Sequence, residues 1–340
     1  MSDLRSALFV LLAAILLTGC GGGGEEALPS TGGSPAAIRS ALVAEGRTAY
    51  ATYCVGCHGV AGDGQGPAAV FLDPKPRDFR LAKFKFSSTR SGMLPTDGDL
   101  KRTIRRGLRG SAMPGWKLLP TGTVEALVAY IKTFSPKWTS SRRATPIPRV
   151  GDPYRFLVDK AEAIKRGEAV YHGFATCWTC HPSYLPVESV NAHLIAMENP
   201  PRSAFRDNLF ESEGKPNENG EMIYPPDFRR DYVRSGSTVE DLYRSVAAGI
   251  TGTAMPTWVD SMDYASSIEG RPPVVRTADL WALAYYVQHL IRLRPSKLTP
   301  ELFAVRRRRQ VIYLHGGVPE PPGDVGGPAR REEFDEFEEP

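Results

Sequence analysis

Apolar side chains recur with the spacing of an amphipathic helix in two stretches of the chain, Val124 to Phe134 and Asp279 to Leu293. A third apolar stretch, Ala7 to Leu17, is an uninterrupted run of eleven residues behind a single basic residue, Arg5. This run is too short for a helix that spans a bilayer, which needs about 20 residues, and it has the length of a signal-peptide core. The pattern therefore predicts two amphipathic helices in the body of the chain and an N-terminal export signal.

Polar stretches follow each of the two amphipathic helices. Ser135 to Val150 holds three prolines and four basic residues without an apolar period, which predicts a semi-rigid linker. Beyond Leu293, the basic run Arg306 to Arg309 and the acidic Glu332 to Glu339 flank a stretch rich in glycine and proline. We expect a solvated, partly disordered tail there; the alternative is that its charges orient the protein on a partner.

Length and composition narrow the class of protein. A chain of 340 residues is long enough for two domains. Its 41% hydrophobic and 24% charged residues are typical of a globular protein and exclude a disordered or fibrous one. The formal net charge is +4. Because the end of the chain is acidic, the rest of the chain carries a net positive charge larger than +4.

The middle of the chain contains an internal repeat. Gly107 to Trp116 matches Gly249 to Trp258, 142 residues further on, and both segments contain Ala-Met-Pro. Upstream, the Pro-x-Asp-Phe-Arg segment that ends at Arg80 matches the one that ends at Arg229. Each copy ends with one of the two amphipathic helices, so the chain consists of two equivalent units.

Four of the five cysteines lie in two identical frames, one in each unit. Both frames read Cys-x-x-Cys-His, at 54–58 and 177–181. On a helix, positions i, i+3 and i+4 face one side, which is the geometry of c-type haem attachment: the thiols bind the porphyrin and the imidazole binds iron. A thioredoxin-like redox motif, a zinc site and structural disulfides are the alternatives. A redox motif would not explain the histidine after both pairs, and a zinc site would need a second coordinating pair at a matched spacing.

A haem of this type needs a sixth iron ligand. Of the seven methionines, only Met113 and Met255 occupy equivalent positions in the two units. A proline follows each of them and stiffens the turn that presents the sulfur atom. We therefore expect axial ligation by these two methionines, and packing in the core is the alternative.

With these motifs, both units resemble class I cytochrome c domains. The resemblance implies an all-α fold with two tandem domains, each a small helical bundle around a covalently bound haem. It also implies that Gly46 and Tyr50 face Tyr130 where the terminal helices cross, as do their counterparts Gly167, Tyr171 and Tyr286 in the second unit. The implied thioether bonds are at Cys54, Cys57, Cys177 and Cys180, and the implied iron ligands of the two c-type haems are His58, Met113, His181 and Met255.

The second unit departs from the family pattern after its haem motif. The glycine-rich loop Gly62 to Pro67 of the first unit has no counterpart there, and the distance from histidine to methionine grows from 55 to 74 residues. The insertion spans about 182–224 and contains His193 and Met197, which lie four residues apart. We expect a polar surface loop with Glu211 to Glu221 at its tip; a rival sixth ligand or an extra metal site is the alternative.

The fifth cysteine belongs to the N-terminal signal. Leu-Thr-Gly-Cys, ending at Cys20, resembles the lipobox of bacterial lipoproteins, which implies that Cys20 is acylated. The following residues are rich in glycine and form a flexible tether. The expected segments are a signal peptide 1–19, a tether 20–35, a first unit 36–134, a linker 135–160, a second unit 161–293 and a tail 294–340.

Together these features predict an electron carrier rather than an enzyme. With histidine and methionine on both sides of each iron, no site stays open for a substrate. We expect a lipid-anchored protein on the periplasmic side of a membrane, with redox proteins such as a respiratory complex or a terminal oxidase as partners, and neither nucleic acid nor a small-molecule substrate. A haem-bearing subunit of a larger respiratory complex and a dihaem peroxidase are the alternatives.

Overall fold

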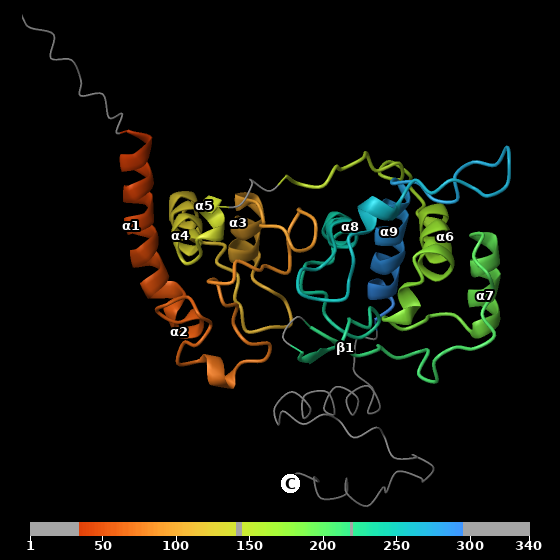
Figure 1. The fold of residues 1–340 in the computed structure, drawn as a ribbon, viewed down its shortest axis with the longest axis horizontal. Helices are drawn as coiled ribbons and strands as arrows, with labels where there is room; N and C mark the ends of the chain where they lie inside the picture. The colour runs from red at the N-terminus through yellow and green to blue at the C-terminus, as the bar shows by residue number, and fades with distance from the viewer. Residues whose placement is uncertain (1–33, 141–144, 218–219, 295–340) are drawn as a thin grey trace, which may run out of the picture. The chain divides into compact units, whose positions relative to one another are not determined.

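The computed structural model describes residues 34–140, 145–217 and 220–294 (Figure 1). The predicted signal peptide, the predicted acylation site Cys20, nearly all of the tether and all of the tail beyond Arg294 lie outside these residues. The described part is mostly helical, with a single two-stranded hairpin, so the predicted all-α fold class is confirmed. None of the described helices combines the length and the apolar character that crossing a membrane requires.

The first unit is a small helical bundle. Its core consists of buried side chains from three helices and the connecting loop, among them Tyr50, Phe79, Leu100 and Leu127. α3 packs against α4, the amphipathic helix that the sequence predicted. The helices are α1 (Pro35–Tyr53), α2 (Val55–His58), α3 (Asp97–Arg106), α4 (Thr121–Thr133) and, in the predicted linker, α5 (Lys137–Ser140); Ala69–Phe71 forms a 3₁₀ turn.

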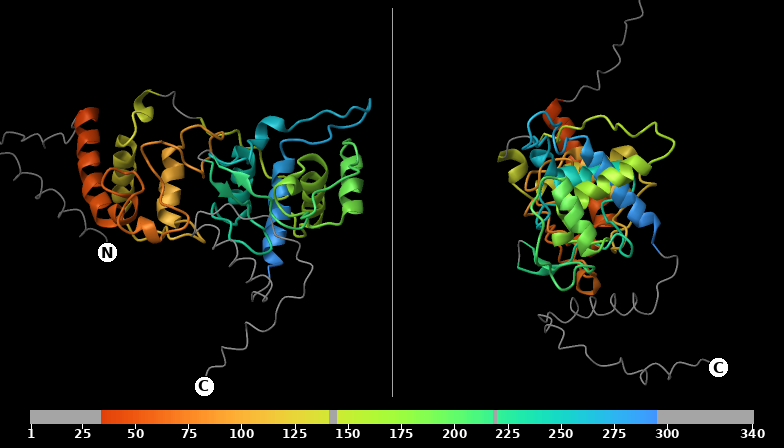
Figure 2. Two further views of the ribbon diagram at one scale, coloured as in Figure 1. Left: turned by 60° about the horizontal axis from the view of Figure 1, so that its bottom comes forward. Right: turned by 90° about the vertical axis from the view of Figure 1, so that its right-hand side faces the viewer.

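The second unit repeats this arrangement with additions. α9 packs against both α6 and α8, next to which it lies in Figures 1 and 2. It supplies more buried residues to the core of the second unit than any other helix does. β1 and β2 pair antiparallel, with Lys215 opposite Ile223. The helices are α6 (Ala161–Ala169), which continues as a π turn (Val170–Phe174), a 3₁₀ turn (Cys177–Thr179), α7 (Val187–Ala196), α8 (Val239–Ala248), a 3₁₀ turn (Trp258–Ser261) and α9 (Asp279–Arg292); the strands are β1 (Lys215–Pro216) and β2 (Met222–Ile223).

Equivalent residues begin α3 and α8. The hydroxyl of Thr96 accepts a hydrogen bond from the Asp99 amide at 3.1 Å, and Thr238 accepts one from the Asp241 amide at 3.2 Å. An N-cap of this kind satisfies an otherwise unpaired helical N–H and stabilises a helix by about 1 kcal/mol. Both aspartates are buried, so the repeat extends to the capping residues of these two helices.

The predicted crossing of the terminal helices is confirmed in both units. A Cβ added to Gly46 would lie 2.0 Å from the carbonyl oxygen of Ala126, and the rings of Tyr50 and Tyr130 are 5.3 Å apart. In the second unit a Cβ on Gly167 would lie 2.1 Å from the Ala282 oxygen, so no larger residue fits at either crossing.

The second crossing carries the same aromatic pair. The rings of Tyr171 and Tyr286 lie 5.5 Å apart, with their planes 63° from parallel. An edge-to-face contact of this kind is favourable for aromatic side chains. The close approach of backbones and the tyrosine pair therefore occur together in each unit.

The insertion is not the polar surface loop that we expected. Its first part forms α7, whose Val190 and Leu194 are buried in the core of the second unit, followed by the buried Met197 and Leu209. The spacing of these apolar residues, i, i+4 and i+7, is that of one helix face. Only the β1–β2 hairpin matches the expected polar tip.

The predicted linker also makes ordered contacts. Ile147 is buried, and its amide donates to the Ser88 oxygen in the first unit at 2.7 Å. The Val150 oxygen accepts from the indole of Trp281 in the second unit at 3.0 Å. Hydrogen bonds therefore hold the linker to both units. They restrict its conformation more than its prolines alone would.

The helix crossing generates a stability prediction. Gly167→Ala should lower the free energy of unfolding of the holoprotein by about 2 kcal/mol, because overpacking outweighs the roughly 1 kcal/mol that alanine adds to a helix. Gly122→Ala is the matched control: it lies in α4 with open space around its Cβ position, and it should leave stability unchanged or raised. Thermal unfolding measures both, and a stabilised Gly167→Ala variant would contradict the close approach.

Candidate functional site

Both Cys-x-x-Cys-His motifs form one tight turn. In the first unit Cys54 precedes α2, and the His58 amide donates to the Cys54 oxygen at 2.9 Å. In the second unit the His181 amide donates to the Cys177 oxygen at 2.8 Å, although the turn is 3₁₀ rather than α-helical. In each motif, therefore, the backbone from the first cysteine to the histidine forms a single turn.

The first cysteine of each motif has a raised pKa. The four cysteines of the two motifs are free and half-buried. Burial raises the pKa of Cys54 to about 11 and that of Cys177 to about 12. A thioredoxin-like motif and a zinc site both need a thiolate, which a lowered pKa favours. The environment of these thiols therefore counts against both alternatives.

The zinc alternative also lacks ligands. Within the residues that the structure describes, no group of three or more His, Cys, Asp or Glu side chains is arranged to hold a metal ion. A closed zinc site needs four such ligands.

A backbone carbonyl orients the imidazole in each motif. Nδ1 of His58 lies 3.1 Å from the Arg77 oxygen, and Nδ1 of His181 lies 3.0 Å from the Pro226 oxygen. A carbonyl only accepts, so Nδ1 donates and the lone pair of Nε2 is left for a metal. Burial lowers the pKa of His58, and it lowers that of His181 to about 4, so both rings are neutral at neutral pH.

An aromatic ring fixes the plane of each imidazole. His58 stacks on Phe79 with ring centres 4.5 Å apart and planes 19° from parallel. His181 stacks on Phe228 at 4.9 Å and 17°. Both phenylalanines belong to the repeated Pro-x-Asp-Phe-Arg segment, to which the sequence analysis gave no role. The repetition of this segment in both units was the feature of the sequence from which a role for the two phenylalanines could have been inferred.

A tyrosine on the crossing helix ties the turn to the bundle. The Tyr50 hydroxyl donates to the Gly59 oxygen at 2.8 Å, and the Tyr171 hydroxyl donates to the Pro182 oxygen at 2.9 Å. Each acceptor is the residue directly after the histidine. The helix crossing therefore positions the motif as well as the core.

The two methionines lie in matching turns. The Leu108 amide donates to the Met113 oxygen at 3.0 Å, and the Ile250 amide donates to the Met255 oxygen at 3.3 Å. Gly107 begins the first turn with a φ of 65°, and a Cβ on it would lie 2.5 Å from the carbonyl carbon of Pro114. The position therefore needs glycine for conformation and for space.

The donor set of each unit fits a c-type haem. It combines two free thiols, an imidazole whose Nε2 is available, and a methionine in a hydrogen-bonded turn. Because each contact recurs in the other unit, the fit does not depend on one accidental arrangement.

His193 and Met197 contact other residues of the second unit. Nε2 of His193 lies 3.5 Å from the Glu168 carboxylate, and its ring stacks on His172 at 5.9 Å. Met197 is 5% exposed. The sequence analysis did not single out His172, which is fully buried on the π turn and whose pKa burial lowers to about 4.

The two units meet at their methionine turns. In the first turn, the Arg109 guanidinium lies 4.5 Å from the ring centre of Tyr232 in the second unit. Next to the second turn, the Ala248 oxygen accepts from the Ser91 amide at 2.9 Å, and the Thr251 hydroxyl accepts from the Gly92 amide at 3.1 Å. Both turns are therefore part of the interface.

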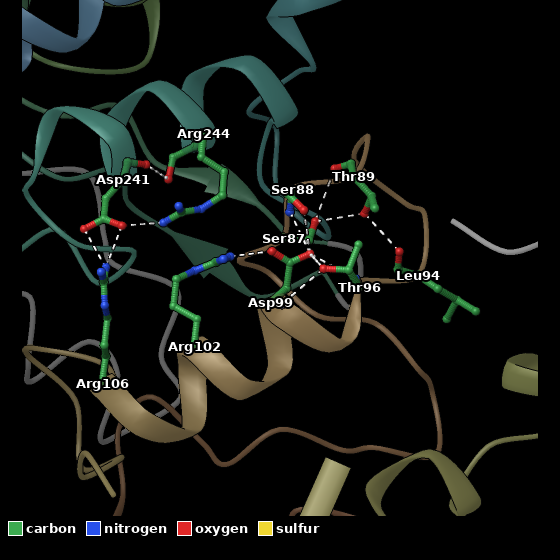
Figure 3. Close-up of polar contacts among 11 residues, drawn as sticks. Ser87, Ser88, Thr89, Leu94, Thr96, Asp99, Arg102, Arg106, Asp241 and Arg244 are labelled. Atoms are coloured by element: carbon green, nitrogen blue, oxygen red, sulfur yellow. Dashed lines mark hydrogen bonds and ion pairs between the residues drawn. The ribbon is translucent and has the colours of Figure 1, made fainter. Parts of the chain in front are cut away.

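Ion pairs reinforce this interface. Figure 3 shows Arg106 of α3 directed at the capping carboxylate of α8, where Nη1 lies 2.7 Å and 2.9 Å from the two oxygens of Asp241. Arg90 forms a second pair with Asp260 through bonds of 2.8 to 3.0 Å. The Asp241 carboxylate is 4% exposed, so the Arg106 pair is shielded on one side, whereas both partners of the Arg90 pair are about half exposed.

Comparisons with known proteins agree with this geometry. Residues 41–131 match the family model of cytochrome c oxidase, cbb3-type, subunit III. A chain of the reducing HAO-like protein complex of Kuenenia stuttgartiensis is similar at 28% identity, with a TM-score of 0.53, over 73% of this chain and 96% of that one. No curated protein matches. Residues 41–131 are therefore a cytochrome c domain, and the likeness to the solved chain extends beyond them over 73% of this chain.

Proposed function

We propose that the protein carries single electrons on two haems with histidine–methionine ligation. The observation that carries this proposal is the duplication of the whole site: motif, carbonyl-bonded histidine, stacked phenylalanine and methionine turn. The proposed attachment residues are Cys54 and Cys57 in the first unit and Cys177 and Cys180 in the second. The proposed iron ligands are His58 with Met113 and His181 with Met255.

The chain's own residues set the conditions for electron transfer. When bound, a c-type haem supplies reversible one-electron chemistry at its iron. The two carbonyl-bonded histidines would each bind an iron through Nε2, and Met113 and Met255 would each supply a sulfur ligand. If both ligands bind each iron, no coordination position would remain for peroxide or oxygen, which favours a carrier over a dihaem peroxidase.

The interface favours electron transfer between the two units. Both methionine turns lie at it, and Arg106 and Arg90 reach across it to carboxylates. Because the turns would present the sulfur ligands, the arrangement would bring the ligand side of each haem towards the other unit. One electron would then enter at one haem and leave from the other.

Redox proteins are the proposed partners. The similar chain from Kuenenia stuttgartiensis belongs to a complex, which supports a role beside other redox proteins. A respiratory complex or terminal oxidase fits a carrier, and a subunit role within a larger oxidoreductase is the second candidate. We further propose that a lipid on Cys20 tethers the protein to a membrane outside the cytoplasm, on the basis of the lipobox-like sequence.

Replacing each methionine ligand tests the ligation. Met113→Ala and Met255→Ala should each remove half of the near-infrared charge-transfer band that sulfur ligation gives ferric haem, because each removes one thioether ligand. Met93→Leu is the control, since Met93 is 46% exposed and lies outside the turns. An unchanged band in the Met255→Ala holoprotein would exclude Met255 as a ligand.

Weakening the interface tests the electron path. The double variant Arg90→Gln, Arg106→Gln removes both ion pairs and should slow electron transfer between the haems several-fold, measured after photoreduction of the holoprotein. Lys117→Gln removes an exposed charge from the same unit and should have no effect. If the double variant kept the rate of the unaltered protein, the interface would not be the path.

A further inference from the structure

One side chain of the insertion reaches the second haem motif. Nη2 of Arg206 lies 3.0 Å from the Trp178 oxygen and 2.9 Å from the His181 oxygen, so it donates to two carbonyls inside the Cys-x-x-Cys-His turn. The same nitrogen lies 3.3 Å from the Leu209 oxygen and 2.6 Å from the Glu211 oxygen. The guanidinium thus joins the motif to the insertion.

In the first unit, backbone amides of the glycine loop donate to the carbonyl oxygens of the motif. The His58 oxygen, which corresponds to that of His181, accepts from the Gly64 amide at 2.9 Å. The Gly66 amide donates to the Cys57 oxygen at 3.1 Å, and a Cβ on Gly66 would lie 2.5 Å from the Gly56 oxygen. The glycine loop therefore packs directly on the first motif, and its one charged side chain is the acidic Asp63, whose Oδ1 accepts from the Gln65 amide at 2.9 Å.

The charge of Arg206 is only partly balanced. An arginine keeps its proton at all ordinary pH values, and this side chain is 18% exposed. Its Nη1 is buried without a hydrogen-bond partner, and the nearest carboxylate, Glu213, lies 3.6 Å away and is 42% exposed. Each histidine has a further charged neighbour: Asp227 lies near His181, and Arg77 lies near His58. Asp78, the counterpart of Asp227, pairs with Arg80.

We propose that Arg206 raises the reduction potential of the second haem, an inference that rests on the proposed function. Adding one electron from a redox partner to the iron lowers the charge of the site by one. A fixed positive charge in a poorly solvated position stabilises the reduced form relative to the oxidised form. Arg206 is a positioning residue in this account, because it acts through the carbonyl of His181 and through its field.

The test is a potentiometric titration of the holoprotein. In Arg206→Met the potential of the second haem should fall while that of the first stays constant. Arg206→Lys keeps the charge and should retain most of the potential. The transition that Met255→Ala shifts identifies the second haem.

Two further variants keep the test decisive if Arg206→Met loads haem poorly. Glu213→Gln removes the nearest negative charge and should raise the second potential. Arg271→Met is the control: it removes an equal charge from an exposed position of the second unit, where water screens it, so the shift should be much smaller.

The outcomes separate this inference from the proposed function. Uptake of fewer than two electrons per chain by the unaltered holoprotein would refute the two-haem proposal. Two transitions of which neither moves in Arg206→Met or Glu213→Gln would refute the role of Arg206 alone. A fall in Arg206→Lys as large as that in Arg206→Met would assign the effect to hydrogen-bond geometry and overturn the electrostatic account.

Discussion

The geometry of both Cys-x-x-Cys-His motifs depends on one hydrogen bond, made once in each unit, from Nδ1 of the histidine to a backbone carbonyl. It fixes the tautomer and leaves Nε2 as the only free nitrogen of the ring. The carbonyl belongs to the segment that also supplies the stacked phenylalanine, so the ring is held at its edge and on its face. The tyrosine at the glycine crossing donates a hydrogen bond to the residue after the histidine, so the helix crossing also holds the motif in place.

The two units share this framework and differ in what surrounds it. The first motif lies under a loop of neutral glycine amides, and the second lies under an insertion that brings a guanidinium. Two haems with the same proposed ligands would therefore stand in different electrostatic surroundings. Because both methionine turns also lie at the interface between the units, this difference would act within a single electron path.

The sequence predicted the parts of the site that depend on residue type and spacing. The helical class and the approach of Gly46 to Tyr130 are confirmed, whereas the ligand roles of the cysteines, histidines and methionines stay predictions. The carbonyls of Arg77 and Pro226 could not be predicted, because every residue carries a carbonyl and only the fold selects one. The contacts of Arg206, and of Arg106 with Asp241, depend on tertiary packing in the same way.

The central claim is that each motif holds one covalently bound haem. The mass of the denatured mature holoprotein tests it most directly, together with a titration of its free thiols. The account predicts a mass increase of two haems per chain and no titratable thiol at Cys54, Cys57, Cys177 or Cys180. One haem, or any thiol that reacts at these four positions, would contradict it.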